Sequence, residues 1–347
     1  MKNEHYKKPA IADFLYFLKM KKNLLILIIF VLISVFVWYE IYLPKDSRSK
    51  TNKIFSIEKG QSLFQIAENL EKEKLIKDRF SFDFYVILKD KQGNLQAGEY
   101  KLNPSMNIPQ IIKKFVLGDT FKIKLTFPEG LTQVQINELL QSSNLIKKDI
   151  FALKVGDFKE EFDFLSKIPD ETSLEGFLFP DTYFFEPETG EKELVEIFLK
   201  NFDKKFNLDL KEKIKEEKKT TFEIITMASL IEKEVKTLED KKLVSGILWK
   251  RLKNRVPLQV DATISYITGK KTTEVSIEET KIDSPYNTYK YLGLPKGSIC
   301  NPGLESILAA IYPEDSGYWY YLSTNEGKTI FSKTLEEHNF VKSKYLK

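Results

Sequence analysis

The longest apolar run in the chain lies near its start. Residues 24–39 (LLILIIFVLISVFVWY) contain no charged side chain, and with Glu40 tolerated the apolar stretch reaches residue 43. About 20 helical residues, at roughly 1.5 Å rise each, cross the ~30 Å hydrocarbon layer of a membrane. Trp38 and Tyr39 stand at the far end, where aromatic rings favour the headgroup region, and three lysines precede the run. The pattern predicts a transmembrane helix over residues 24–43.

The flanks of this helix bear on its topology. A cleaved signal peptide would have a shorter apolar region followed by small residues, whereas Trp, Tyr, Glu, Ile and Tyr follow here. Lys and Arg are equally numerous within about 15 to 20 residues of each end, but the tightest cluster abuts the N-terminal end. We therefore expect residues 1–23 to be a cytoplasmic tail and the rest of the chain to face outward. Ile11, Phe14, Leu15 and Leu18 have helical spacing, which fits either an interfacial helix or an extension of the spanning helix.

The pattern after the spanning helix predicts a linker and then a repeat. Residues 44–53 are polar and are expected to be the linker. Residues 60–76 align without gaps on residues 130–146. Each copy has a turn glycine, a Ser or Thr that can cap a helix and an amphipathic helical pattern, preceded by a strand-like segment at 54–57 or 121–127. Each copy predicts a small β-α unit, although such patterns also recur by chance.

The first copy resembles a known module. Its G-x-S-L-x-x-I-A pattern, from Gly60 to Ala67, is similar to the LysM-type sugar-binding module, a strand-helix-helix-strand unit that binds N-acetylglucosamine polymers. The resemblance implies a LysM-like subdomain over residues 54–118 that contacts glycan. We expect residues 119–220 to form a connecting β-α region and residues 221–347 a separate catalytic domain. The predicted fold class is α+β, with a mixed α/β catalytic domain after the transmembrane helix.

Composition and charge exclude several function classes. The chain has 347 residues, 42% hydrophobic and 30% charged, which is the range of globular proteins. One cysteine cannot form an internal disulfide, and with only two histidines there is no ligand set for zinc or iron–sulfur chemistry, so we expect no metal or cofactor. The net charge of +4 divides into +6 over residues 1–53 and −2 beyond. The outer part therefore lacks the basic footprint of a nucleic-acid-binding protein.

The last 125 or so residues hold the candidate chemistry. An apolar helical stripe over residues 222–235 contains the motif S-L-I-E-K-E, in which Ala228 and Ser229 leave space for a ligand beside Glu232. On pattern alone, Glu232 and Lys236 could equally form an ordinary surface pair. Residues 258–266 alternate as an extended segment would, with Gln259, Asp261 and Thr263 on one side. Two loops, 283–289 and 293–303, are dense in the Tyr, Asn, Gly and Pro residues that suit sugar binding or structural turns.

Five sequence blocks, in order, resemble the endolytic murein transglycosylases of the YceG/MltG family. They are residues 175–183 (EGFLFPDTY), 228–234 (ASLIEKE), 258–261 (LQVD), 284–289 (SPYNTY) and 293–303 (GLPKGSICNPG). The resemblance implies that the first Glu of the E-K-E motif, Glu232, is the catalytic acid. Ser284 and Val235 stand where Thr is common in the family, and Lys296 where a second Pro is common.

The chemistry that the resemblance implies needs one acid. A hydrolysing glycosidase normally uses two carboxylates. A lytic transglycosylase needs one, because the 6-hydroxyl of N-acetylmuramic acid attacks its own anomeric carbon and closes a 1,6-anhydro ring. Gln259, Asp261, Tyr286 and Asn287 are candidate substrate contacts, and a catalytic Asp261 would permit hydrolysis instead.

The expected function is cleavage of the MurNAc-GlcNAc bond within nascent peptidoglycan strands, ending their elongation. The expected location is the cell (inner) membrane, as a single-pass protein with an extracytoplasmic catalytic domain. Peptidoglycan strands are the predicted partner, and peptidoglycan synthases are further candidates. The alternative is a membrane-anchored glycan-binding scaffold of the cell-wall synthesis machinery that lacks turnover.

Overall fold

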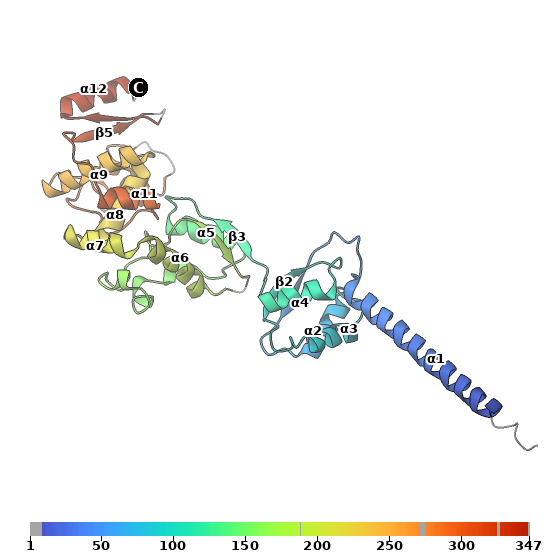
Figure 1. Ribbon diagram of the computed structural model, residues 1–347. Helices are drawn as coiled ribbons and strands as arrows, with labels where there is room; N and C mark the ends of the chain where they lie inside the picture. The colour runs from blue at the N-terminus through green and yellow to red at the C-terminus, as the bar shows by residue number, and fades with distance from the viewer. Residues whose placement is uncertain (1–8, 188, 271–274, 325–326, 346–347) are drawn as a thin grey trace, which may run out of the picture. The chain divides into compact units, whose positions relative to one another are not determined.

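The computed structural model describes residues 9–187, 189–270, 275–324 and 327–345 (Figure 1). Residues 1–8 of the predicted cytoplasmic tail lie outside the described residues. The chain divides into two compact units, Met1–Lys122 and Ile123–Lys347. Helices combine with two-stranded antiparallel sheets in the described part of the chain, so the mixed helix and sheet class predicted from the sequence is confirmed.

The first unit begins with a long helix, α1 (Pro9–Tyr42). The stretch Phe14–Tyr42 within it is long and apolar enough to cross a membrane. Because α1 is continuous, the apolar residues ahead of the predicted span extend the same helix and form no separate interfacial one. Its side chains from residue 14 onward are mostly exposed, but near its end Ile41 is buried in the core of the first unit.

The rest of the first unit packs helices on one face of a sheet. Its elements are β1 (Lys53–Ile57), α2 (Leu63–Lys72), α3 (Arg79–Leu88), β2 (Gly98–Leu102) and α4 (Ile108–Leu117). β1 and β2 are antiparallel, with Phe55 opposite Tyr100. Both rings point to the core, where the Phe115 ring lies 4.7 Å from the Tyr100 ring, centroid to centroid. Strand alternation leaves Ile54 on the outer face of the sheet.

The second unit holds the remaining elements. They are β3 (Ile123–Thr126), α5 (Gln133–Ser142), the short turns η1 (Ile150–Ala152), η2 (Val155–Asp157) and η3 (Asp163–Leu165), β4 (Thr182–Phe185), α6 (Glu191–Lys205), α7 (Leu208–Glu216), α8 (Thr221–Glu234), α9 (Leu238–Lys253), α10 (Asp261–Thr268), η4 (Glu279–Lys281), α11 (Leu304–Ile311), β5 (Tyr320–Ser323), β6 (Thr329–Ser332) and α12 (Leu335–Tyr345). The strands pair as β3–β4 and β5–β6, both antiparallel.

The core of the second unit runs through most of its length. It includes Phe127, Phe198, Ile225, Leu248 and Ile307, all at most 1% exposed. The residues predicted as a connecting region, 119–220, and those predicted as a catalytic domain, 221–347, therefore contribute side chains to one core.

The local geometry of the sequence repeat is the same in both copies. Gly60 and Gly130 adopt positive φ angles of 84° and 77°, which glycine tolerates. Ser62 and Thr132 then begin α2 and α5 through capping boxes, in which the side chains of the cap and of the third helical residue each bond the other's backbone N–H. The two copies belong to different units, so equal local patterns serve two separate cores.

Candidate active site

Helix α8 brings the E-K-E motif to the surface of the second unit. A capping box between Thr220 and Glu223 begins the helix, and all its residues from 224 to 231 are buried. The helix ends at Glu234, after which Val235 has extended backbone angles. Since each helical residue turns the chain by about 100°, Glu232 and Glu234 point to nearly opposite sides of α8. The two carboxylates of the motif therefore have different surroundings.

A groove of about 1910 Å³ lies on the Glu234 side of the helix. This volume exceeds the ~300–1,000 Å³ typical of small-molecule pockets. The groove is lined by side chains from α5, the end of α8, α10, the β5–β6 hairpin and the segments between helices. Polar and aromatic members of this lining are Gln135, Glu234, Lys236, Gln259, Asp261, Tyr289 and Tyr320. Glu232 is not part of this lining.

Glu234 has the environment of a general acid. Burial, followed by the charge of Asp261, raises the pKa of its carboxyl to about 7. The Tyr321 hydroxyl and the backbone N–H of Ala262 hydrogen-bond this carboxyl and limit the rise. A pKa near neutrality allows a carboxylic acid to donate a proton and take one back under physiological conditions. Glu234 belongs to the sequence motif, but nothing in the sequence indicates that the pKa of its carboxyl is raised.

Asp261 and Gln259, two of the substrate contacts predicted from the sequence, line the same groove. Their predicted extended conformation is wrong, because Asp261 is the first residue of α10. Thr263, expected on the same side, is buried and bonds the Val260 carbonyl at 2.7 Å. The Tyr289 hydroxyl donates to the Asp261 carboxylate. Gln259 takes a left-handed backbone angle, φ 53°, which is uncommon outside glycine and often marks functional positions.

Glu232 lies in a separate polar cluster. Its Oε2 accepts hydrogen bonds from the Ser306 hydroxyl at 2.6 Å and the Gly303 backbone N–H at 3.1 Å, both at the start of α11. The ammonium of Lys241, on α9, is 3.5 Å away and almost fully buried. The predicted surface pairing with Lys236 is absent among the described ion pairs. Glu232 thus ties α8 to α9 and α11, and its side chain is 10% exposed.

A third carboxylate, Glu129, lies beside this cluster. Its burial, together with the charge of Glu232, raises the pKa of the Glu129 carboxyl. An added Cβ at Gly303 would lie 1.9 Å from Glu129 Oε1, so the glycine permits this close approach. The glycine of the Asn301-Pro302-Gly303 sequence is therefore required for packing against Glu129.

Asn287 and Tyr286, the other two predicted substrate contacts, lie outside the groove that Gln259 and Asp261 line. Asn287 is buried, and its amide nitrogen donates to the carbonyls of Thr280 and Ile282 at 3.0 and 2.7 Å. Its carbonyl oxygen accepts from the backbone N–H of Tyr289 at 2.9 Å, so the side chain organises its own turn. Tyr286 is partly buried against Tyr266, with ring centroids 5.1 Å apart, and neither Tyr286 nor Asn287 lines the groove.

A buried carboxyl holds the blocks of the site together. Glu175 accepts hydrogen bonds from the backbone N–H of Gln133 at 2.9 and 3.0 Å and from Asn301 Nδ2 at 2.9 Å. The Asn301 side-chain oxygen accepts from the Gly176 N–H at 2.9 Å. Burial raises the pKa of Glu175 to about 8. These bonds join the segments 175–180 and 301–303 to the start of α5. Glu175 and Asn301, which belong to the family's sequence blocks, therefore have a structural role.

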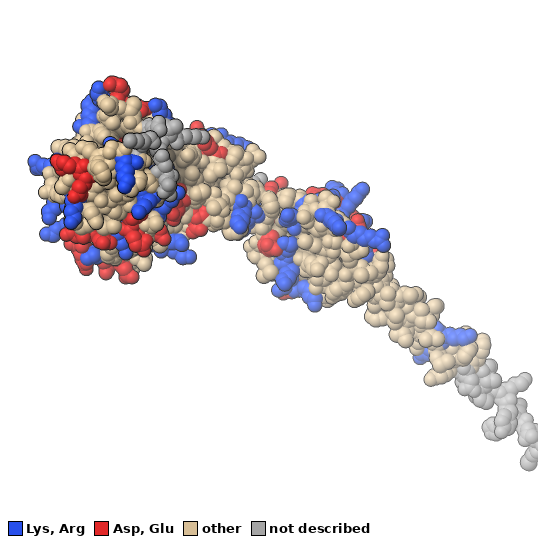
Figure 2. Space-filling view, turned by 90° about the horizontal axis from the view of Figure 1, so that it is seen from above, with Lys and Arg blue, Asp and Glu red and all other residues tan. Residues whose placement is uncertain are grey.

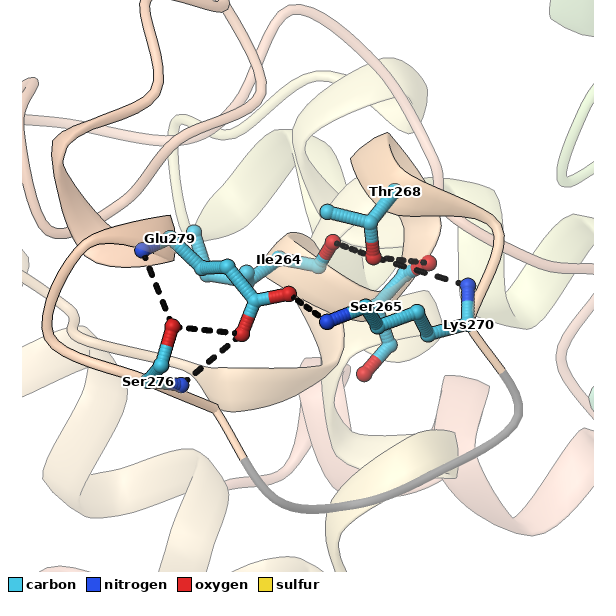
Figure 3. A network of polar contacts seen from close by, with 6 residues as sticks. All are labelled: Ile264, Ser265, Thr268, Lys270, Ser276 and Glu279. Carbon is cyan, nitrogen blue, oxygen red and sulfur yellow. Dashed lines mark hydrogen bonds and ion pairs between the residues drawn. The ribbon is translucent and has the colours of Figure 1, made fainter.

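A network of polar contacts lies where α10 ends (Figure 3). Lys270 lines the groove, and its ammonium pairs with Glu279, which lowers the pKa of that carboxyl to about 2. Ser276 donates to the other oxygen of Glu279 from its backbone N–H at 2.9 Å. The Thr268 hydroxyl bonds the Ile264 carbonyl at 3.0 Å near the helix end. Among the described residues, no cluster of three or more His, Cys, Asp or Glu side chains could hold a metal ion.

Comparison with known proteins identifies the family. The YceG-like family matches residues 55–344. The chain is 34% identical over 316 residues to the endolytic murein transglycosylase of Bacillus subtilis (strain 168), covering 87% of each protein. It is 32% identical over 337 residues to the protein of the same name from Streptococcus pneumoniae (strain R6), covering 86% of this chain and 59% of that protein. A crystal structure of a YceG-like protein from Listeria monocytogenes is 34% identical, with a TM-score of 0.58 over 84% of this chain and 100% of that one. The chain belongs to the YceG-like family.

Proposed function

We propose that this protein is a membrane-anchored lytic transglycosylase that cuts the β-1,4 bond between N-acetylmuramic acid and N-acetylglucosamine inside nascent peptidoglycan strands. The relatives named endolytic murein transglycosylase support the substrate class. The observation that carries the chemistry is the Glu234 carboxyl, whose pKa is raised to about 7, beside Asp261 in a groove of about 1910 Å³. Cutting a growing strand near the membrane would end its elongation.

We assign the acid role to Glu234. The protonated carboxyl donates its proton to the glycosidic oxygen as the bond from that oxygen to the anomeric carbon breaks. Positive charge then develops on the muramic acid ring, where the Asp261 carboxylate is close enough to the acid to raise its pKa and is suited to stabilise that charge. The 6-hydroxyl of the same ring attacks the anomeric carbon, its proton passes to the Glu234 carboxylate, and the 1,6-anhydro end forms without consuming water.

Glu232 is the second candidate for the acid, because the family resemblance points to the first Glu of the motif. Its carboxylate is already hydrogen-bonded by Ser306 and Gly303 and paired with Lys241. Glu234 lines the groove and Glu232 does not, which favours Glu234 as the proton donor to a strand bound there.

The first unit and α1 suggest where the enzyme works. We propose that Phe14–Tyr42 spans the cell membrane with a cytoplasmic N-terminus, so that the second unit acts outside. The chain order β1, α2, α3, β2 supports the LysM-like interpretation of the first unit as a glycan adaptor. Peptidoglycan synthases, which make the strands that this enzyme would cut, are the proposed protein partners.

The deciding experiment is mass analysis of products from purified glycan strands, using wild type, Glu234→Gln and Glu232→Gln. We expect 1,6-anhydro ends from wild type, loss of product with Glu234→Gln, and activity with any Glu232→Gln protein that remains folded. Wild-type activity should fall about tenfold per pH unit above pH ~7, as the acid loses its proton. Reducing ends in place of anhydro ends would assign a hydrolase, and binding without any product would assign a scaffold. Activity of Glu234→Gln with loss in Glu232→Gln would return the acid role to Glu232.

A further inference from the structure

Helix α3 has two apolar faces. One face packs in the core of the first unit through the buried side chains of Phe82 and Val86. The other carries four large apolar side chains that are each more than half exposed, Phe80, Phe84, Ile87 and Leu88. At 100° per residue these four fall within an arc of about 100°, so they form one continuous stripe. Exposed stripes of this kind are uncommon on surfaces that face only water.

The stripe is extended by the neighbouring helix. Phe64, on α2, is half exposed, and the Arg79 guanidinium lies over both the Phe64 and Phe80 rings, at 4.9 and 4.8 Å from their centroids. Arg79 thus bridges the two phenyl rings while its charge stays at the edge. We call these five apolar side chains, on α2 and α3, the α3 face.

Helix α3 and the segment before it contact the end of the membrane-spanning helix. The Lys77 ammonium lies 3.6 Å from the centroid of the Tyr39 ring and donates to the Tyr39 carbonyl at 3.3 Å. The Tyr42 and Tyr85 rings meet edge to face, 6.2 Å apart. Tyr39 and Tyr42 are the aromatic residues expected at the headgroup level where α1 leaves the bilayer. Helix α3 is therefore held at the depth of the membrane surface by contacts within its own unit.

The charge of the unit suits the same surface. Residues 44–122 contain fifteen Lys or Arg against ten Asp or Glu. Figure 2 shows basic side chains outnumbering acidic ones on the visible face of this unit. Lysine and arginine beside an exposed apolar stripe can extend to anionic headgroups while their stems cover apolar surface.

We propose that the α3 face rests in the outer leaflet of the membrane, so that the first unit lies against the bilayer with anionic lipid at its basic rim. This inference rests on the proposed membrane anchorage by α1. The second contact would fix the tilt of α1 and the first unit on the membrane surface, which the spanning helix alone would not do. Its occupant is lipid, which leaves the glycan-binding role of the first unit to a different surface.

The test uses the full chain in vesicles of phosphatidylcholine and phosphatidylglycerol that contain spin-labelled lipids. A fluorophore is attached to a cysteine introduced as Phe84→Cys on the α3 face. Ile54→Cys, on the outer face of the β1–β2 sheet, is the matched control, since Ile54 is an apolar side chain of similar exposure. Leu27→Cys, in the middle of α1, reports the anchor. The native Cys300 is fully buried, so it does not compete for the label.

We expect lipids labelled near the headgroup to quench the Phe84 label several-fold more than the Ile54 label, and deeply labelled lipids to quench the Leu27 label. Equal, weak quenching at positions 84 and 54 with strong quenching at 27 overturns the α3 contact and leaves the anchor intact. Absence of quenching at 27 overturns the anchor and the α3 contact together. Quenching at 84 that disappears on addition of soluble glycan strands would assign this face to glycan.

Discussion

Replacing Glu234 by Gln should make the second unit more stable at alkaline pH while it abolishes activity. The folded state raises the pKa of this carboxyl from 4.5 to about 7, mainly through burial. A group with a raised folded pKa binds its proton more tightly in the folded state. Folding therefore incurs no cost from this group below pH ~4.5, an increasing cost between pH ~4.5 and ~7, and a constant cost above that. Glutamine does not titrate, so Glu234→Gln removes the cost.

The size of this effect follows from the difference between the folded and unfolded pKa. Each tenfold change in proton affinity corresponds to about 1.4 kcal/mol, so the ionised carboxylate costs at most about 3 kcal/mol of the free energy of unfolding at pH ~8. Since Gln has almost the shape of Glu and its carbonyl can still accept from Tyr321 or Ala262, little packing energy is lost. The gain of the variant over wild type should be near zero at pH ~4.5 and largest above pH ~7.

The assay is denaturant unfolding of the full chain in detergent at several pH values. Fluorescence of Trp249 and Trp319 reports on the second unit, since the third tryptophan, Trp38, lies in α1. Glu171→Gln, at an exposed position of the same unit, is the control and should show no pH-dependent gain. A Glu234→Gln protein with the same stability difference from wild type at every pH would refute the desolvated acid and with it the proposed catalytic role.

Three further substitutions test the structural roles assigned above. Glu232→Gln should lower the free energy of unfolding by about 3–5 kcal/mol, because it leaves the buried Lys241 without its nearest carboxylate. The added change Lys241→Met should recover part of that loss in the same unfolding assay. Asn287→Ala should lower the free energy of unfolding by about 1–3 kcal/mol, because it leaves carbonyl groups of the turn without their hydrogen bonds. Its affinity for glycan, measured by calorimetry on folded protein, should stay unchanged. A large loss of affinity would restore Asn287 as a substrate contact. Gly176→Ala should prevent normal folding, because φ is 97° and the new Cβ would lie 2.4 Å from the Ser298 hydroxyl, and a wild-type melting temperature by calorimetry would contradict this.

The sequence predicted the structure correctly where a local pattern is compatible with only one type of secondary structure. An apolar run of about 20 residues that contains only Glu40 as a charge predicted the helix of α1, and the capping residues Ser62 and Thr132 marked the starts of two helices. Near Gln259 and Asp261 the same kind of reasoning failed. Alternation over residues 258–266 is compatible with a strand, but Asp261 begins α10, held by the buried bonds of Thr263 and Thr288. Those bonds join segments about 25 residues apart, which no local pattern contains.

The E-K-E motif separates most clearly what sequence determines from what packing decides. Sequence alone places two carboxylates on one helix and, by helical geometry, on nearly opposite sides of it. It does not say which side faces open solvent. In the folded chain α9 and α11 cover the Glu232 side, where Lys241, Gly303 and Ser306 occupy its carboxylate. The Glu234 side meets α10 and β5, which leave a groove and desolvate the Glu234 carboxyl. The pKa of a carboxyl depends on neighbours from distant segments, and only the tertiary structure brings those neighbours to it.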